Sequence, residues 1–320
     1  DQQFEILLLY ARLAATEQAK IFRVGRRRRI ILATNVAETS LTVPGIGFVI
    51  DSGLARISRY SARRNLQQLP IEAISQANAA QRAGRCGRIA PGHCYRLYSE
   101  ADFASRAQFP EAEIHRTHLG GVILQMLTMG LGSVEEFPFL EPPSPRAIND
   151  GYRLLAELGA TDSRQVTPVG RRMAPLPLDP RLSRMLLAAI DGHCCYEAII
   201  IAAGMSVGDV LNIPKQAQAI AIQRHGRFLS RQSDYISMLL LWHRLEWHRQ
   251  QLTRKQFGLF CEQHFVSLPR FFEWRDICRQ LRLTLTRTLR LDREQLRQAT
   301  HFGSYLQHSL SEVSSEIDPE

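Results

Sequence analysis

The stretch Gln81-Arg82-Ala83-Gly84-Arg85-Cys86-Gly87-Arg88 combines a carboxamide, several guanidinium groups and a pair of glycines. On a helix of about 100° per residue, the spacing of Gln81, Arg85 and Arg88 by four and three residues puts them on one face. Each glycine costs about 1 kcal/mol relative to alanine inside a helix, which indicates close packing against a neighbour. Guanidiniums that converge on one face suit a polyphosphate, because each donates two hydrogen bonds and keeps its charge at any relevant pH. The alternative is an arginine-rich surface helix without a ligand.

Two apolar runs upstream of this stretch predict strands. Arg29 to Thr34 is continuous in branched apolar residues, which predicts a buried parallel strand, and Gly47 to Asp51 predicts the next strand. The first run leads into the polar turn Thr34-Asn35-Val36-Ala37-Glu38-Thr39-Ser40, at the strand end where open α/β sheets bind ligands. The order of elements in this domain is completed by an apolar run from Ile6 to Tyr10, a helical pattern up to Phe22 and a strand from His93 to Tyr98. The pattern predicts a doubly wound parallel sheet of the α/β class.

Between the second strand and the opening stretch, the residues from Gly53 to Pro70 alternate between apolar and polar types. Arg56, Arg59 and Arg63 lie in this segment, which predicts a basic β-hairpin. Ser75 is placed to cap the helix that carries Gln81. The first domain is expected to end near Phe103.

Helical patterns dominate the rest of the chain, which predicts an all-α region after the α/β domain. Helices at residues 117–131 and 146–158 with a small hairpin at 160–169 have the size and order of a winged helix. Further helices, which predict a bundle, are expected at residues 181–191, 196–205, 230–249, 254–265 and 269–288. The aromatic residues expected in the core of that bundle are Phe257, Phe260, Phe265, Phe271, Phe272 and Trp274.

Composition limits the classes of protein to which the chain can belong. Its 320 residues, 45% of them hydrophobic, fit two or three domains, and the net charge of +9 favours a polyanionic partner. We expect neither a membrane span nor a signal peptide, since no apolar run approaches 18 residues without charge. The scattered cysteines lack metal-site spacing, so we expect no metal ligands and a reduced, cytoplasmic setting. No phosphate loop of the GxxxxGK[ST] form occurs in the sequence.

Residues 33–42, 49–53 and 81–88 together resemble, in order and spacing, the consecutive motifs of the second RecA-like domain of DEAH-box RNA helicases. Residues 110–131, 154–160 and 177–183 resemble that family's winged-helix and ratchet segments. The forms of residues 10–13 and 228–242 are most similar to a bacterial branch of the family. The domains implied by the resemblance are a second RecA-like domain at 1–104, a winged helix at 105–177, a ratchet-type helical bundle at 178–298 and a polar tail or linker at 299–320.

The resemblance also implies roles for individual residues in nucleotide chemistry. Gln81 would position the attacking water, and Arg85 and Arg88 would be arginine fingers that neutralise charge on the transferred phosphoryl group. Ser40 would sense the γ-phosphate, Thr42 would reach the ribose region and Phe22 would stack on the base. Taken alone, Phe22 predicts a core residue, and Ser40 and Thr42 predict ordinary hydrogen bonds in a turn.

For RNA, the resemblance implies contacts to the phosphodiester backbone. Thr34 and Asn35 match positions at the end of the first strand, and Arg56, Arg59 and Arg63 match a hairpin near the point of strand separation. The implied partners are single-stranded RNA or a duplex with a 3′ overhang, on which movement runs 3′ to 5′. A membrane partner is not expected, and the protein is expected to be a monomer.

The family hydrolyses ATP with a phosphate loop and a DEAH acid on its first RecA-like domain, and this sequence contains neither. The resemblance therefore implies a C-terminal piece of an ATP-dependent RNA helicase. ATP or another NTP, with Mg²⁺, would be held mainly by the absent domain, so the chain alone would be inactive and its finger face solvent-exposed. The alternative is a freestanding, non-catalytic nucleic-acid-binding or regulatory module, which has no need of Gln81, Arg85 and Arg88 on one face.

Overall fold

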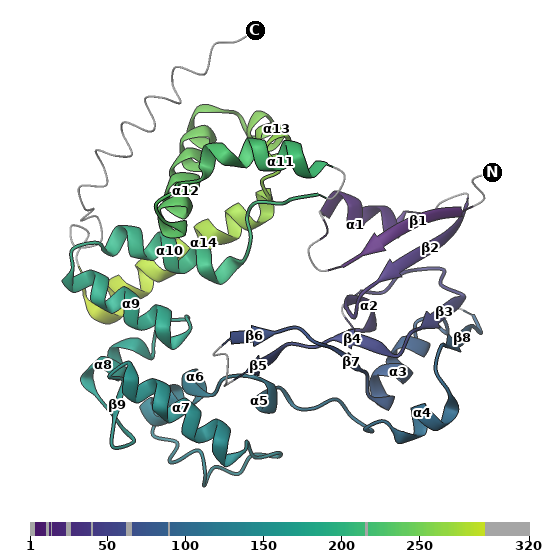
Figure 1. Ribbon diagram of the computed structural model, residues 1–320, viewed down its shortest axis with the longest axis horizontal. Coiled ribbons are helices and arrows are strands. Elements are labelled where there is room, and N and C mark those ends of the chain that lie inside the picture. The colour runs from purple at the N-terminus through teal and green to yellow at the C-terminus, as the bar shows by residue number, and fades with distance from the viewer. Residues whose placement is uncertain are drawn as a thin grey trace. The chain divides into compact units, whose positions relative to one another are not determined.

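The structure is a computed structural model that describes residues 4–10, 13, 15–23, 27–39, 41–61, 66–88, 90–214 and 217–291. The chain divides into two compact units, one of residues 1–119 and 138–147 and the other of residues 120–137 and 148–320. The first unit holds most of the strands, and the second consists mainly of helices (Figure 1). The first unit includes residues 105–119 and 138–147, which the sequence assigns to the winged helix.

Parallel strand pairs form the framework of the first unit. β1 (Phe4–Leu9) pairs with β2 (Arg28–Ala33), and β3 (Phe48–Asp51) pairs with β8 (His93–Arg96). Helix α1 (Ala15–Phe22) connects the first two strands and packs against β1, as in a βαβ unit. Leu9 and Ile21 are buried there. All four strands lie where the sequence predicts them.

The run Arg29 to Thr34, predicted as a buried strand, is only partly buried, and this expectation is wrong; the next strand is open as well. Ile30 and Leu32 of β2 and Phe48 and Ile50 of β3 are exposed, and Ile50 is 71% exposed. Strands buried on both faces need a cover on each face. In the described part of the chain β1–β2 and β3–β8 are separate two-stranded sheets rather than one sheet, so one face of each pair stays open.

A two-stranded ribbon carries the basic segment of the first unit. β4 (Leu54–Arg56) pairs antiparallel with β7 (Ile71–Ala73), and β5 (Arg59–Ser61) pairs antiparallel with β6 (Leu66–Gln68). A hydrogen bond of 3.1 Å from the Ile57 N–H to the Pro70 carbonyl links the two pairs. The predicted hairpin is therefore confirmed, and the pairing extends to Ala73.

The tight turn between β3 and β4 requires glycine at position 53. Gly53 has a φ of 71°, and a Cβ atom there would lie 2.6 Å from the ring of Tyr98. No other residue type fits both the backbone and the space. The turn thus fixes the direction in which the ribbon leaves the end of β3.

Short helices complete the first unit. They are α2 (Val36–Thr39), α3 (Gln76–Ala83), α4 (Glu100–Ser105) and α5 (Glu113–Arg116). Ser75 caps α3 as the sequence predicts, since its Oγ accepts a hydrogen bond of 3.2 Å from the Asn78 N–H.

The second unit begins with α6 (Gly120–Met129) and α7 (Pro145–Glu157), a helix whose first residues belong to the first unit. A small hairpin of β9 (Thr161–Asp162) and β10 (Gln165–Val166) follows, and then α8 (Pro168–Met173). Thr167 caps α8 by accepting a 3.0 Å hydrogen bond from the Gly170 N–H. The two predicted helices and the hairpin are confirmed with small shifts at their ends.

Helices of the bundle follow, close to their predicted bounds. They are α9 (Pro180–Asp191), α10 (Cys195–Val207), α11 (Gln218–His225), α12 (Asp234–Gln251), α13 (Arg254–Gln263) and α14 (Leu268–Leu289), with a 3₁₀ turn η2 (Gly226–Phe228) after α11. Helix α11 was not predicted, because its short polar-apolar pattern is weak.

Helix α10 is the centre of the bundle and packs against α9, α12 and α14. The Trp274 indole N–H donates a 2.8 Å hydrogen bond to the Ile200 carbonyl and so joins α14 to α10. Phe257, Phe271 and Trp274 are buried as predicted, whereas Phe272 is 36% exposed and lies at the edge of the core.

All six cysteines are free thiols. Among the helices of the described residues, none has both the length and the apolar character that crossing a membrane requires.

Candidate functional site

The opening stretch is not one continuous helix, which corrects the predicted geometry. Helix α3 ends at Ala83, and Gly84 is its C-cap, with its N–H bonded to the Ala80 carbonyl at 2.9 Å. Arg85 and Arg88 lie in the irregular turn that follows. Two glycines within four residues disfavour helix continuation, and glycine is common at helix C-termini.

The arginines of this turn nevertheless converge on one place, the segment of residues 38–42. Arg85 donates a 3.2 Å hydrogen bond from Nη1 to the Leu41 carbonyl and another from Nη2 to the Glu38 carbonyl. Arg88 donates from Nη1 to the Thr42 hydroxyl. The structure thus brings Arg85, Arg88 and Thr42 together, although not by the helical spacing that the sequence indicates.

Gln81 lies in the last turn of α3 and is exposed, as is Arg88, whereas Arg85 is half-buried. The expected solvent-exposed face is therefore confirmed for two of its three members. Ser40 lies outside the described residues.

The electrostatics of the arginine pair favour an anion. Burial and then the neighbouring charge of Arg88 lower the pKa of the Arg85 guanidinium. The hydrogen bonds that these two arginines make in the described residues go to carbonyl and hydroxyl oxygens, which carry no formal charge. Two like charges held together by neutral acceptors are stabilised when an anion binds both.

A buried ion network holds α3 against the strand ends. Arg82 donates from Nε to Glu38 at 2.7 Å and from Nη1 to Asp51 at 2.7 Å, and the Asn78 amide donates to Glu38 at 2.9 Å. The side chains of Asp51 and Glu38 are 0% and 9% exposed. Arg82, which lies off the face of Gln81, Arg85 and Arg88 on a helical wheel, has the structural role that this position predicts.

Asp51 stays ionised in this network. Burial would raise the pKa of Asp51, but hydrogen bonds from the Gly53 N–H, from Arg82 and from the Tyr98 hydroxyl together lower it. The same contacts act on Tyr98, whose pKa burial and the Asp51 carboxylate raise to about 12. Asp51 is therefore a fixed anion that positions α3 and β4, not a proton donor.

Glu38 is the member of this network that sequence reasoning missed. Its carboxylate binds α3 through Asn78 and Arg82, while its carbonyl accepts from Arg85. The available signal was an acidic residue in a turn directly after a strand, in a segment otherwise made of small and neutral side chains.

The end of β2 presents the residues that were expected to contact RNA. The Thr34 and Asn35 carbonyls accept hydrogen bonds of 3.1 and 3.0 Å from Ala37 and Glu38 and so begin α2. Both residues are exposed, which leaves their side chains accessible. Phe22, the last residue of α1, is 42% exposed, so the alternative that it is a core residue does not hold.

The arginines of the ribbon have different surroundings. Arg59 binds the Glu72 carboxylate with hydrogen bonds of 2.5 and 2.8 Å and the Glu111 carboxylate at 2.5 Å. Its hydrogen bond to Glu72, above all, raises the pKa of Arg59. Arg56, on β4, is exposed. Arg63 lies outside the described residues.

No cluster of three or more histidine, cysteine, aspartate or glutamate side chains that could hold a metal ion occurs in the described ranges.

Two family models match the chain, and they match the parts that carry these features. The helicase conserved C-terminal domain matches residues 1–90, and the helicase-associated domain (HA2), described as ratchet-like, matches residues 179–238. The first match includes the arginine pair and the 38–42 segment, and the second includes α9 and α10. The fold and the site thus define a helicase C-terminal region of mixed α/β and helical composition.

The chain is also similar to curated ATP-dependent RNA helicases. The chain is 50% identical over 289 residues, 88% of its length, to the ATP-dependent RNA helicase HrpA homolog of Haemophilus influenzae. It is 50% identical over 284 residues, 87% of its length, to the ATP-dependent RNA helicase HrpA of Escherichia coli. It is 36% identical over 270 residues, 83% of its length, to the probable ATP-dependent RNA helicase DHX35 of Homo sapiens.

By these matches the chain is homologous to the C-terminal part of DEAH-box RNA helicases. It spans 22% of the length of each of the two HrpA relatives and 38% of the length of DHX35.

Proposed function

We propose that this chain is a C-terminal part of an ATP-dependent RNA helicase and supplies arginine fingers to a nucleotide held by another domain. The observation that carries the proposal is the convergence of Arg85 and Arg88 on the 38–42 segment, where their hydrogen bonds go to neutral oxygens. A module that only binds nucleic acid would not need two arginines whose hydrogen bonds go to a hydroxyl and two carbonyls rather than to carboxylates.

The proposed domains have the bounds that the sequence predicts. The connection β1–α1–β2 and the parallel pair β3–β8 support a RecA-like, doubly wound domain at residues 1–104. Helices α6 and α7 with the β9–β10 hairpin support a winged helix at 105–177. The bundle of α9 to α14 and the ratchet-like match support a ratchet domain at 178–298. The polar tail or linker at 299–320 is proposed from the sequence alone.

In the proposed reaction Arg85 exchanges its carbonyl acceptors for oxygens of the transferred phosphoryl group, and Arg88 neutralises the charge that develops there. Such fingers contribute about 10³ to 10⁵ in rate in NTP hydrolysis. Gln81, exposed next to them, positions the attacking water. Bound ATP or another NTP, with its Mg²⁺, supplies the phosphoryl group.

Three further residues complete the proposed nucleotide site. Phe22 offers an exposed ring for stacking on the base. Thr42, which accepts from Arg88, lies in the ribose region, and Ser40 senses the γ-phosphate. The first RecA-like domain of the same parent chain holds the rest of the nucleotide, so this chain alone does not hydrolyse ATP.

The proposed RNA path uses Thr34 and Asn35 at the end of β2, Arg56 of the ribbon and, from the resemblance alone, Arg63. Neutral donors and arginines bind phosphates without reading sequence, which suits movement along single-stranded RNA in the 3′ to 5′ direction. Arg59 is a weaker candidate than Arg56, because two carboxylates already occupy its guanidinium. We propose that the parent protein acts as a cytoplasmic monomer on RNA with a 3′ overhang.

The test compares this chain with a longer protein that joins it to its ATP-binding domain. We expect RNA-stimulated ATP hydrolysis from the longer protein and none from the 320-residue chain. Hydrolysis by the chain alone, or a parent gene that encodes no ATP-binding domain upstream of Asp1, would favour a freestanding RNA-binding module instead.

A further inference from the structure

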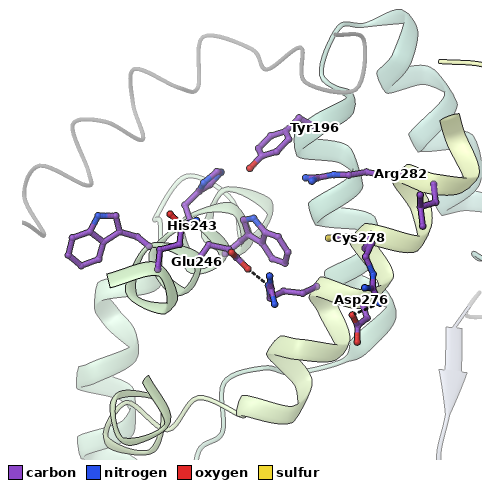
Figure 2. A pocket seen from close by; sticks show the side chains of 12 residues that line it. Tyr196, His243, Glu246, Asp276, Cys278 and Arg282 are labelled. Atoms are coloured by element: carbon purple, nitrogen blue, oxygen red, sulfur yellow. Dashed lines mark hydrogen bonds and ion pairs between the residues drawn. The ribbon is translucent and has the colours of Figure 1, made fainter. Parts of the chain in front are cut away.

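A cavity of about 630 Å³ beside α12 and α14 in the second unit has paired charges in its wall. Figure 2 shows Glu246 of α12 and Asp276 of α14 in this wall. Glu246 accepts a hydrogen bond from Arg275, which joins α12 to α14, and Asp276 pairs with Arg279 at 3.1 Å. These pairs give the acidic side chains a role in the helical bundle. The first unit, by contrast, presents apolar surface along its parallel strands.

The parallel strands of the first unit form two separate pairs, β1–β2 and β3–β8 (Figure 1). Within the described residues, β2 and β3 each have a hydrogen-bonded neighbour on one side only. The Thr34 N–H donates to the last carbonyl of β1 at 3.0 Å, and the Leu97 N–H donates to the last carbonyl of β3 at 2.9 Å. Because backbone groups alternate in direction along a strand, the N–H groups of Ile31 and Ile50 point to the opposite edges. Both strands therefore present an open edge.

The C-terminal ends of β2 and β3 are held near each other. Arg82 of α3 binds both Asp51, the last residue of β3, and Glu38 of α2, the helix that follows β2, at 2.7 Å each. Neighbouring strands lie about 4.8 Å apart, so one strand between β2 and β3 would separate them by about 10 Å. A guanidinium with a carboxylate on each side can bridge that distance. The two open edges are thus placed on either side of a gap for one parallel strand.

Each strand pair has a helix on one face and uncovered apolar side chains on the other. Helix α1 packs on β1, where Leu9 and Ile21 are buried, and α3 packs on β3. The side chains that alternate with these point to the opposite face and are 44% to 71% exposed: Ile6, Leu8, Ile30, Leu32, Phe48 and Ile50. Since parallel strands normally have both faces covered, this face lacks a layer.

The handedness of strand connections indicates where that layer comes from. A crossover between parallel strands is right-handed in nearly all proteins, so its direction along the sheet decides which face its helix covers. Helix α1 connects β1 to β2, in the direction of the gap. A helix that connects a strand in the gap to β1 runs in the other direction and covers the opposite face, where Leu8 and Leu32 are exposed. One strand and one helix before β1 would therefore fill both the gap and the open face.

We propose that a strand and a helix from the residues that precede β1 in the parent protein complete the first unit. The strand lies in the order β1–β2–strand–β3–β8 and is apolar on both faces, and the helix is amphipathic. A second copy of this chain does not fit, because the gap has room for one strand and the strands of a copy already belong to sheets. The chain spans 22% of the length of its HrpA relatives, which have the residues for such a segment. The proposal rests on the proposed function only in requiring a longer parent.

Amide hydrogen exchange measured by NMR tests this proposal. It compares the 320-residue chain with a protein that is longer at its N-terminus by about 40 residues of the parent, enough for a strand, a helix and their loops. The amides of Ile31 and Ile50 report on the open edges. Those of Leu32 and Asp51, which point to β1 and β8, are internal controls. The longer protein needs no ATP-binding domain, so the finger proposal can fail while this one holds.

We expect the Ile31 and Ile50 amides to exchange about 100-fold more slowly in the longer protein, whereas the Leu32 and Asp51 amides are protected in both. Equal exchange of Ile31 and Ile50 in the two proteins would overturn the proposal. Protection that grows with the concentration of the 320-residue chain would also overturn it, because a second copy then covers the edges. If the shorter chain protects none of the four amides, the longer protein decides: faster exchange of Ile31 and Ile50 than of Leu32 and Asp51 contradicts the strand.

The variant Leu32→Asp tests the helix that covers the apolar face. It should lower the urea midpoint of the first unit, followed by its NMR signals, by about 1 M or more in the longer protein, the effect of losing a buried leucine. In the 320-residue chain, where Leu32 is 57% exposed, the decrease should be at most about half as large. Leu140→Asp is the matched control, because Leu140 of the same unit is 100% exposed, and it should change neither midpoint. An equal effect of Leu32→Asp on both proteins would rule out the covering helix.

Discussion

Arg82 and Arg85 are three positions apart in the sequence, yet their guanidiniums meet opposite surroundings. Arg82 is bound by the buried carboxylates of Glu38 and Asp51, whereas Arg85 and Arg88 donate to carbonyl and hydroxyl oxygens. The two carboxylates hold Arg82 in a structural role. Arg85 and Arg88, which donate to uncharged oxygens, can exchange these acceptors for those of a ligand. The difference depends on Glu38, whose carboxylate and carbonyl serve different arginines.

We expect Arg82→Gln to lower the free energy of unfolding of the first unit by about 3 kcal/mol, because it leaves two buried carboxylates without their cation. Lys20→Gln is the matched control in the same unit. The Lys20–Glu17 pair is about half exposed, so its loss should cost less than about 1 kcal/mol. Urea unfolding followed by circular dichroism measures both, and equal stability of the two variants would contradict the network.

His248 makes the bundle sensitive to acid. Its ring stacks on that of Phe260, with the ring centres 3.9 Å apart. Burial, together with the charges of His264 and Arg244, lowers the pKa of His248 from 6.5 to about 4. Below pH 6.5 the unfolded chain binds a proton that the folded chain does not, so stability is full above pH 6.5 and declines as the pH falls toward 4.

His248→Phe should therefore reduce the loss of thermal stability between pH 7.5 and pH 5. A smaller loss remains in this variant, because burial also lowers the pKa of His225 and His264. The measurement is the melting temperature of both proteins at both pH values. An equal decrease in wild type and variant would show that His248 is not the responsible group.

At the scale of helices, two glycines test the packing of the bundle. A Cβ at Gly204 of α10 would lie 2.6 Å from Met238 Cε and 2.9 Å from the Trp274 ring, while a Cβ at Gly258 of α13 would have no atom within 4 Å. We expect Gly204→Ala to destabilise the bundle by about 1 to 2 kcal/mol through overpacking. Gly258→Ala should stabilise it by up to about 1 kcal/mol through helix propensity. Chemical denaturation compares them, and a change of the same sign in both variants would argue against the packing of α10 on α14.

The ribbon allows a similar comparison for RNA binding. Arg56 is exposed, and Arg59 is engaged by Glu72 and Glu111. Each phosphate that an arginine neutralises steepens the plot of log affinity against log salt by about 0.7 to 0.9. Arg56→Gln should therefore reduce the slope for single-stranded RNA by about that amount, and Arg59→Gln should change it less. Fluorescence anisotropy across salt concentrations measures the slopes, and a larger effect of Arg59→Gln would reverse the assignment.

Helix and strand positions were predictable where the sequence pattern is strong. The helices from α9 to α14, apart from α11, follow long periodic segments, and their ends lie within a few residues of the predicted ones. The end of α3 at Ala83 was missed, because the spacing of Gln81, Arg85 and Arg88 suits one helix face, whereas Gly84 ends the helix. The exposure of Ile50 was also beyond prediction, since it depends on which element covers a sheet face.

For the whole molecule, the order of the motifs was sufficient to predict the family, and the family matches confirm it. Most of the contacts within the site were not predictable. The bond from Arg59 to Glu111 and that from Arg82 to Glu38 join residues far apart in the sequence, and no local pattern marks such partners. The hydrogen bond from Arg88 to Thr42 was not predicted, although the resemblance implies that both residues lie at the nucleotide.

The central claim is that Arg85 and Arg88 serve a nucleotide held by another domain of the same parent protein. Single-turnover ATP hydrolysis by a longer protein that includes that domain, with the protein in saturating excess over ATP and with saturating RNA, tests it most directly. The variants are Arg85→Ala and Arg88→Ala, and Arg28→Gln, an exposed arginine on β2, is the control. We predict a decrease in rate of about 10³-fold or more for each finger variant, with little change for the control. Hydrolysis at the wild-type rate by Arg85→Ala and Arg88→Ala would contradict the account.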